Sequence, residues 1–260
     1  MRQSCHFRLH DLTRRHMAER PEIPIYAISL ADSDARRATL LSAMTKIGLP
    51  FEFVNAIDGR AGLPPCYSDS YDKAATRRRL GRDLSTAEIA ASLSHGLVYT
   101  RILEEGHDHA LIFEDDAEPG PLLPKFLSSG CYRSAPIVLL HHLNARVMPG
   151  KRTPGGDGIA LRELAVPCFR AAAYTVSREA AKALRDASMP VTTPPDWPCD
   201  ITRIGAFVTE PQIVGHPPQD TGQSILSASG RTRDRAPLSR IFHLSYLRRK
   251  WRKARSERIS

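Results

Sequence analysis

The chain has 260 residues, of which 42% are hydrophobic and 25% charged, as in an ordinary globular domain. No run of about 18 apolar residues occurs, so no transmembrane helix is expected. The five cysteines are scattered and form no CxxC pair, which argues against a disulfide framework and a zinc site. We therefore expect free thiols in a reducing compartment, the cytoplasm.

The net charge of +9 is concentrated near the end of the sequence. Residues 231–260 hold eleven Lys and Arg against Asp234 and Glu257, so residues 1–230 are neutral. A nucleic-acid-binding domain would carry basic residues across its body. We therefore expect no nucleic-acid partner, although binding through the tail alone remains an alternative. Residues 1–21 lack the apolar core of a secretory signal and are expected to form a poorly ordered leader.

Apolar runs alternate with helix signals from residue 23 onward. The helix expected at 85–105 begins with a capping box, in which Ser85 and Glu88 bind free amides. Residues 60–82 are turn-rich and basic, so we expect a surface excursion there, and the Gly and Pro residues of 151–158 indicate a loop. We expect strands at 23–30, 51–54, 110–113, 137–140, 171–176, 207–208 and 213–214, and helices at 35–47, 85–105 and 177–187.

This alternation predicts one α/β domain at 22–230 with a mostly parallel central sheet. The basic and aromatic tail at 231–260 follows it, and we expect a helix there.

Three acids, Glu114, Asp115 and Asp116, directly follow the apolar strand expected at 110–113. Ligands of open α/β sheets bind beyond the carboxyl ends of the strands. Adjacent carboxylates repel one another unless a cation or several donors offset their charge. Mn²⁺ or Mg²⁺, held together with substrate phosphates, would do so. The position predicts a metal and phosphate site, with a solvated acidic loop as the plainer alternative.

Four blocks of sequence, in order and at matching spacing, resemble the lipooligosaccharide glycosyltransferases of glycosyltransferase family 25. The resemblance covers roughly residues 22–225, and it is the combination of blocks that makes it specific. The blocks are YAISL at 26–30 with DARR at 34–37, FEFVNAIDG at 51–59, LSTAEIAASLSH at 84–95 leading into LIFEDD at 111–116, and AYTVSREAAK at 173–182 with PDW at 195–197.

The resemblance implies a single GT-A-like, Rossmann-type domain that binds a nucleotide sugar, often UDP-galactose, and a divalent metal. It also implies inversion at the anomeric carbon and a glycan acceptor. The acidic run alone would fit another Mg²⁺-dependent phosphate or nucleotide enzyme equally well, such as a nucleotidyltransferase. A family member that has lost activity is a further alternative.

Candidate site residues follow from the strand ends and from the matched blocks. An inverting transfer needs a carboxylate near the acceptor hydroxyl. Several candidates also have plain structural explanations, such as helix capping for Glu88, turn formation for Asp58 and a core position for His95. We expect Glu114, Asp115, Asp116 and His216 at the metal, Ser29, Arg36, Arg37, Asp58 and His95 at the nucleotide sugar, and Asp196, Asp200 and Glu88 in catalysis.

The tail combines large apolar residues, among them Phe242, Leu247 and Trp251, with a basic second half. Anionic lipids attract basic segments, and aromatic side chains insert at the membrane interface. We therefore expect the tail to dock the protein on the inner face of a bacterial membrane.

Overall fold

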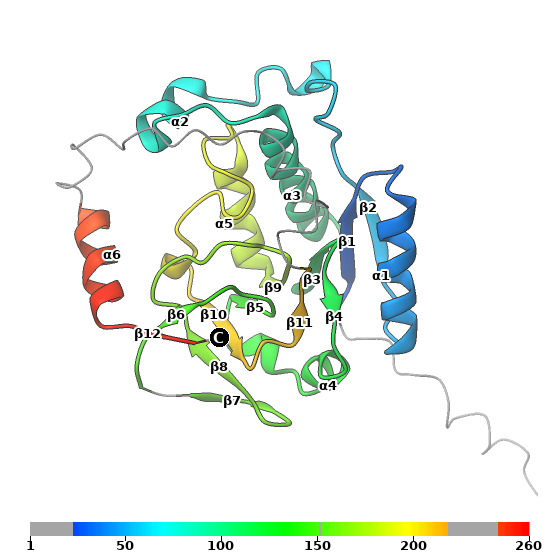
Figure 1. Cartoon of the computed structure of the whole chain (residues 1–260), viewed down its shortest axis with the longest axis vertical. Helices are drawn as coiled ribbons and strands as arrows, with labels where there is room; N and C mark the ends of the chain where they lie inside the picture. Colours follow the sequence, from blue (N-terminus) through cyan, green and yellow to red (C-terminus); the bar gives the residue numbers. More distant parts are fainter. Residues whose placement is uncertain (1–22, 151, 218–243, 260) are drawn as a thin grey trace, which may run out of the picture.

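An eight-stranded sheet forms the centre of the molecule (Figure 1). The computed structural model describes residues 23–150, 152–217 and 244–259, so the expected leader and the first part of the tail lie outside the described residues. In spatial order the strands are β2 (Glu52–Asn55), β1 (Ile25–Ser29), β3 (His109–Glu114), β9 (Ala173–Ser177), β5 (Ile137–Leu139), β10 (Ala206–Glu210), β8 (Ile159–Glu163) and β7 (Thr153–Gly156).

The sheet is mixed, and most of its strands point the same way. β1 is parallel to β2 and β3, and β5 is parallel to β10. β9 runs antiparallel to both β3 and β5, and β8 runs antiparallel to both β10 and β7. All strands except β9 and β8 therefore share one direction, which agrees with the α/β class expected from the sequence.

Helices and two small ribbons complete the fold. None of the helices in the described part of the chain combines the length and the apolar character needed to cross a bilayer. The ribbons are β4 (Glu118–Pro119) with β11 (Val214–Gly215), and β6 (Arg146–Val147) with β12 (Glu257–Arg258). The helices are α1 (Asp34–Lys46), α2 (Lys73–Leu80), α3 (Thr86–Glu104), α4 (Leu123–Ser128), α5 (Arg178–Ser188) and α6 (Leu244–Ala254), with short 3₁₀ helices η1 (Pro65–Tyr67), η2 (Cys131–Ser134) and η3 (Ile201–Arg203).

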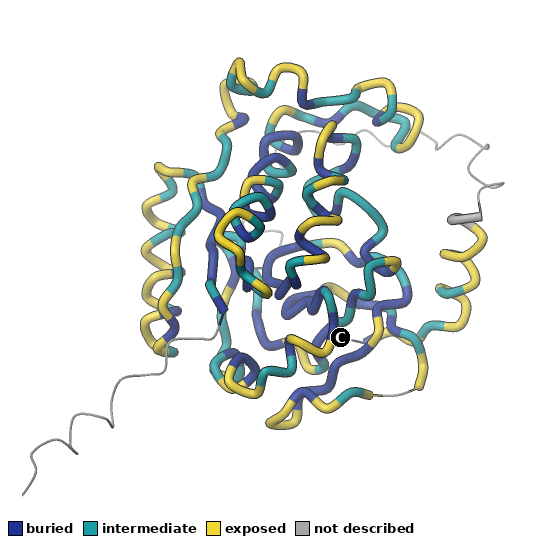
Figure 2. Tube along the Cα trace, turned by 180° about the vertical axis from the view of Figure 1, so that it is seen from behind, coloured by how far each residue is buried: buried dark blue, intermediate teal, exposed yellow. Residues whose placement is uncertain are grey.

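Both faces of the sheet are covered. Alternate residues of a strand point to opposite faces, so Tyr26 packs on one face with Leu184 of α5, while Ala27 packs on the other with Leu40 of α1 and Phe126 of α4. Figure 2 shows the central strands buried and the outward sides of the helices exposed. Strands buried on both faces are apolar throughout, which explains the continuous apolar runs in the sequence.

Regular structure lies within the expected surface excursion at 60–82 and within the expected loop at 151–158, and the second expectation was wrong. α2 lies within residues 60–82, where Asp72 accepts a hydrogen bond from the Ala75 amide at 2.8 Å and Gly81 ends the helix at a φ of 77°. β7 lies within residues 151–158 and pairs with β8 in a hairpin. Capping groups and a pairing partner define these elements, and neither is visible as a hydrophobic pattern.

The last residues of the chain pack against the body of the protein. Arg252 Nε donates to the Ala165 carbonyl at 2.9 Å, and the buried Arg162 forms ion pairs with Glu210 and Glu257. Ile259 is 8% exposed and belongs to the main core cluster. The C-terminal end of α6 and β12 are therefore docked on the domain.

The turn at Asp58 and Gly59 approaches the start of α3 very closely. Thr86 Oγ1 donates to the Gly59 carbonyl at 2.8 Å, and a Cβ at position 59 would lie 2.5 Å from the Thr86 carbonyl oxygen. No real Cβ tolerates that distance, so this contact requires glycine.

We expect Gly59→Ala to lower the free energy of unfolding by about 1–3 kcal/mol, because the backbone must shift to admit the methyl group. Gly96→Ala is the matched control, since a Cβ there meets nothing closer than 3.5 Å. Because Gly96 lies inside α3, this control should be neutral or stabilising by up to about 1 kcal/mol. Urea denaturation of both variants measures the difference, and equal midpoints for Gly59→Ala and wild type would contradict the close contact.

Candidate active site

The register of β1 and β3 brings the first group of candidate residues together. Ile28 lies opposite Glu114, so the next residues, Ser29 and Asp115, meet at the carboxyl end of the two strands. Ser29 Oγ donates to Asp115 Oδ2 at 2.7 Å, and Arg36 Nη1 lies 3.0 Å from Asp115 Oδ1. Burial raises the pKa of Asp115, although the Ser29 hydrogen bond and the Arg36 charge oppose this. Asp115 is therefore compensated by groups of the protein itself.

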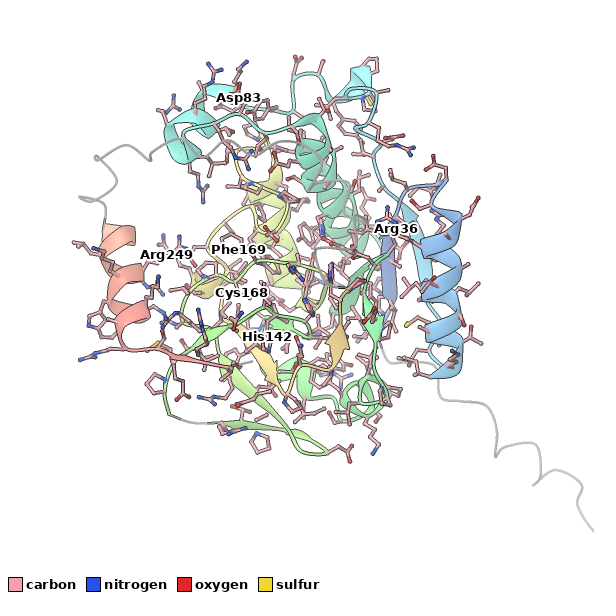
Figure 3. The ribbon with its side chains drawn as sticks, in the orientation of Figure 1. Arg36, Asp83, His142, Cys168, Phe169 and Arg249 are labelled. Atoms are coloured by element: carbon pink, nitrogen blue, oxygen red, sulfur yellow. The ribbon has the colours of Figure 1, made fainter. Side chains whose placement is uncertain are left out.

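Arg37 joins the ends of β1 and β2. Its guanidinium donates to the Ser29 hydroxyl at 3.2 Å, to the Ser29 carbonyl at 3.3 Å and to Asn55 Oδ1 at 2.5 Å, and it lies over the Phe53 ring. Of the two arginines, Arg36 is the one that lies beside a carboxylate of the acidic run, Asp115. Its side chain is 26% exposed (Figure 3).

Glu114 turns toward α3 and meets a buried polar chain. Its Oε1 lies 3.2 Å from His95 Nε2, and His95 Nδ1 lies 2.9 Å from the Tyr174 hydroxyl. Tyr174 is in turn hydrogen-bonded to the Tyr99 hydroxyl at 2.8 Å. Burial raises the pKa of both tyrosines well above the ordinary range, so both phenols stay neutral. The chain Tyr99–Tyr174–His95 thus fixes the imidazole that faces Glu114.

Asp116 faces the opposite side, where the ribbon of β4 and β11 brings His216 to it. Gly215 pairs with Glu118, so His216 reaches the preceding turn and its Nε2 lies 3.3 Å from Asp116 Oδ2. Burial alone would raise the pKa of Asp116, but the hydrogen bond and charge of His216 outweigh burial and lower it. The same contact raises the pKa of His216. The two groups form an ion pair at the sheet edge.

The Asp116–His216 pair and the neighbouring His141 offer acceptor atoms of the kind that bind a cation. Among the described residues, Asp116 Oδ1 and His141 Nε2 are buried atoms without a hydrogen-bond partner. His141 stacks on His216 with ring centroids 5.4 Å apart, and its Nδ1 lies 3.1 Å from the Val214 carbonyl. That contact requires a proton on Nδ1, which leaves Nε2 as a bare acceptor. Burial lowers the pKa of His141 to about 4, so this imidazole is neutral at pH 7.

The side chains that the structure describes do not complete a metal site alone. Within the described residues, no three His, Cys, Asp or Glu side chains are arranged to hold a metal by themselves. Substrate phosphates would therefore have to complete the coordination, as is usual for Mg²⁺.

Asp196 follows α5 in the chain and contacts Arg170 of the loop before β9. Its Oδ1 accepts a hydrogen bond from the Arg170 amide at 2.5 Å, and the Arg170 guanidinium lies 3.4 Å from His216 Nδ1. His216 Nδ1 also lies 2.8 Å from the Pro217 carbonyl and must donate to it, so Arg170 is a close neighbour of His216 and not its hydrogen-bond donor. The loop thereby connects Asp196 to the Asp116–His216 pair.

Three candidates lie in separate local structures. Glu88 is 2% exposed, completes the capping box with Ser85 and forms a two-pronged ion pair with Arg82. Asp200 caps η3 by accepting from the Thr202 amide and hydroxyl. Asp58 binds Arg60, whose hydrogen bonds lower the pKa of this exposed carboxyl to about 2. Each carboxylate has a structural role that accounts for its position.

Sequence reasoning missed His141 and Arg170. His141 follows the apolar run of β5, so the rule that singled out the acidic run applies to it as well. Arg170 gives no such signal, because its amide reaches Asp196 from a left-handed backbone at a φ of 73°. Tyr174 lies in the matched block at 173–182, but no functional role was expected for it.

A sequence model of glycosyltransferase family 25, described as LPS biosynthesis protein, matches residues 22–200. The match spans most of the chain and includes β1, the acidic run, β9 and Asp196. The chain belongs to glycosyltransferase family 25.

Individual relatives are more distant. The chain is 29% identical over 130 residues to the lacto-N-neotetraose biosynthesis glycosyltransferase LgtE of Neisseria meningitidis serogroup B, which covers 47% of this chain and 45% of LgtE. It is 28% identical over 175 residues to LgtB of Neisseria gonorrhoeae, 62% of this chain and 59% of LgtB. A rat protein named probable inactive glycosyltransferase 25 family member 3 is 29% identical to the chain over 119 residues. The aligned part is 39% of this chain and 19% of the rat protein. The matched part is thus less than two thirds of each relative.

We expect Tyr174→Phe to destabilise the fold by about 1–3 kcal/mol, because it leaves both His95 Nδ1 and the Tyr99 hydroxyl buried without their partner. Tyr99→Phe removes an end of the chain and should cost less. Urea denaturation of the two variants gives the comparison. A smaller loss for Tyr174→Phe than for Tyr99→Phe would contradict the central place of Tyr174.

Proposed function

We propose that the protein is a metal-dependent, inverting glycosyltransferase with a GT-A-type fold. It transfers a hexose, galactose from UDP-galactose, to a lipooligosaccharide or another cell-surface glycan. The observation that carries the proposal is the Asp116–His216 pair at the carboxyl end of β3, in a chain of family 25. The Neisseria relatives are named for lacto-N-neotetraose biosynthesis, which supports a glycan acceptor.

Arg36 and Ser29 form the donor side of the proposed site. Arg36 uses Nη1 for Asp115, and a guanidinium has five N–H donors, so donors are left for a phosphate oxygen. Arg is well suited to this because its planar fork matches phosphate geometry. In this proposal Asp115 orients Arg36, and Ser29 holds Asp115.

Asp116 and His216 are the residues that would hold the cation, Mn²⁺ or Mg²⁺. His216 would first have to lose the Nε2 proton that it shares with Asp116, because its Nδ1 donates to the Pro217 carbonyl. When bound, such an ion neutralises charge on the leaving diphosphate. The unpartnered Asp116 Oδ1 supports this assignment, because a buried acceptor without a donor is costly unless something binds it. Glu114 and Asp115 are engaged by His95 and Arg36 and are weaker candidates.

Asp196 is the proposed general base. Its carboxylate takes the proton of the acceptor hydroxyl as the hydroxyl oxygen bonds to the anomeric carbon. The bond between that carbon and the diphosphate oxygen breaks on the opposite side, so one displacement inverts the configuration. The Arg170 amide fixes the position of the carboxylate.

Donor hydrolysis and transfer, measured with UDP-galactose, UDP-glucose and UDP-N-acetylglucosamine with and without Mn²⁺, test the proposal. We expect turnover that is highest with UDP-galactose and depends on Mn²⁺. Asp116→Asn should lower turnover by about 100-fold or more with the fold intact, a loss typical of removing one electrostatic stabiliser. The matched control Asp186→Asn changes an exposed carboxylate on α5 and should leave turnover unchanged.

The same assay separates the two carboxylates of the second half. We expect Asp196→Asn to lose transfer and Asp200→Asn to keep it, because Asn also caps a helix well. Absence of both turnover and Mn²⁺-dependent nucleotide binding would overturn the transferase proposal. Mn²⁺-dependent nucleotide binding without turnover would point to an inactive family member, and hydrolysis of other nucleotides without transfer to a different phosphate enzyme.

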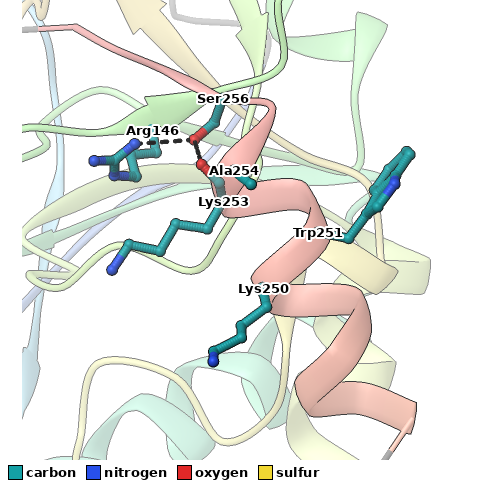
Figure 4. A pocket seen from close by; sticks show the side chains of 6 residues that line it. All are labelled: Arg146, Lys250, Trp251, Lys253, Ala254 and Ser256. Carbon is teal, nitrogen blue, oxygen red and sulfur yellow. Dashed lines mark hydrogen bonds between the residues drawn. The ribbon is translucent and has the colours of Figure 1, made fainter.

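We further propose that α6 docks on an anionic membrane surface. Leu247 and Trp251 lie one helical turn apart and are 54% and 51% exposed. A hollow of about 690 Å³ between α6 and β6 is lined by Arg146, Lys250 and Lys253 among others. Trp251 lines the same hollow, and Figure 4 shows the indole projecting from α6 away from the side chains of Lys250 and Lys253. Basic residues near a surface and an exposed indole together favour an anionic lipid interface.

Charge reversal tests this better than truncation, because the segment after α6 packs in the core. We expect the double variant Lys250→Glu, Lys253→Glu to reduce cosedimentation with vesicles of phosphatidylglycerol and phosphatidylcholine by about 10-fold or more, at about 1 kcal/mol lost per basic residue and further repulsion from the new acids. Lys73→Glu, Lys182→Glu has the same net charge and alters side chains that are 59% and 64% exposed elsewhere. Equal loss in both double variants, or none in either, would contradict docking through α6.

A further inference from the structure

Phe169 is the most exposed of the large hydrophobic side chains in the described ranges, at 68%. It lies in the loop between β8 and β9, next to the buried Cys168, and both are labelled in Figure 3. Single exposed apolar residues are common on protein surfaces. What distinguishes Phe169 is how its neighbours are held.

Both residues that flank Phe169 are tied to the same pair of residues. The Cys168 carbonyl accepts a hydrogen bond from Trp197 Nε1 at 2.9 Å, and the Arg170 amide donates to Asp196 Oδ1 at 2.5 Å. Trp197 is 7% exposed and packs edge-on against Tyr174, with centroids 5.1 Å apart. The backbone on each side of Phe169 is therefore fixed to the segment that carries Asp196.

The loop also carries backbone strain at Arg170, which is not a glycine yet has a φ of 73°. Strained backbone persists where surrounding contacts enforce it, and it gathers at functional sites. Here it directs the Arg170 amide at Asp196 and leaves the phenyl ring of Phe169 in solvent.

We infer that Phe169 is the platform on which the saccharide acceptor stacks. A pyranose has an apolar face of C–H groups that lies well on an aromatic ring, and the ring stands one residue from the amide that positions Asp196. This inference rests on the proposed function, in which Asp196 takes the proton of the acceptor hydroxyl. The donor side, Ser29 and Arg36, gathers around Asp115 at the ends of β1 and β3, whereas Phe169 stands between the two residues that are tied to Trp197 and Asp196.

The test is Phe169→Ala, assayed with UDP-galactose as donor and the methyl β-glycosides of glucose and N-acetylglucosamine as acceptor probes. We expect the acceptor KM to rise about 10-fold, the effect of losing one stacking contact. Donor hydrolysis by water should keep its rate and its KM for UDP-galactose. Phe169→Trp should restore the acceptor KM, because it restores an aromatic face.

Leu41→Ala, which shortens another exposed apolar side chain, 53% exposed on α1, is the matched control and should change neither KM. An unchanged acceptor KM in Phe169→Ala, with transfer intact in wild type, would overturn this inference and leave the proposed function standing. If the wild-type protein did not hydrolyse the donor at all, that result would instead count against the proposed function.

Saturation-transfer NMR with the same methyl glycosides tests the platform without turnover. We expect saturation transfer to the glycoside ring protons in wild type and in Phe169→Trp, and its loss in Phe169→Ala. Equal transfer in wild type and Phe169→Ala, or none in wild type, would overturn the inference.

Discussion

β9 lies between β3 and β5 and runs antiparallel to both, and the arrangement of polar groups at the sheet edge follows from this pairing. An antiparallel strand begins where its neighbours end, so the loop before β9 arrives beside the acidic run and His141. The Ala172 carbonyl accepts from the Glu114 amide, and the Ala173 carbonyl accepts from Leu140. This ladder of backbone hydrogen bonds therefore places Arg170 between Asp196 and His216, the partner of Asp116. Without it, residues from the two halves of the chain would not share an edge.

The second constraint is the repulsion among Glu114, Asp115 and Asp116. Adjacent carboxylates in a partly buried turn must be compensated, and the turn after β3 sends each to a different partner. Glu114 meets His95, Asp115 meets Arg36 and Ser29, and Asp116 meets His216. The protein thus offsets part of the charge that a metal was expected to offset, and this division singles out Asp116.

Much of the fold could be predicted, because strands buried on both faces are continuous apolar runs and the capping box of α3 is local. The direction of β9 could not, since parallel and antiparallel central strands have the same composition. α2 and β7 were not predicted, because the capping residue Asp72 defines the first and pairing with β8 defines the second, and neither produces a hydrophobic pattern. In the site, the acidic run was visible as acids after a strand. Its three separate partners depend on turn geometry, and the contact of Asp196 with Arg170 depends on a left-handed residue.

The C-terminal end of the chain is held on the domain by noncovalent contacts. Arg252 on Ala165, Glu257 on the buried Arg162, and Ile259 in the core attach α6 and β12 to the domain by contacts that need no peptide bond to residue 217. A chain cut between β11 and α6 would therefore yield two fragments with complementary surfaces. The intact connection acts as a tether that raises the effective concentration of one surface at the other.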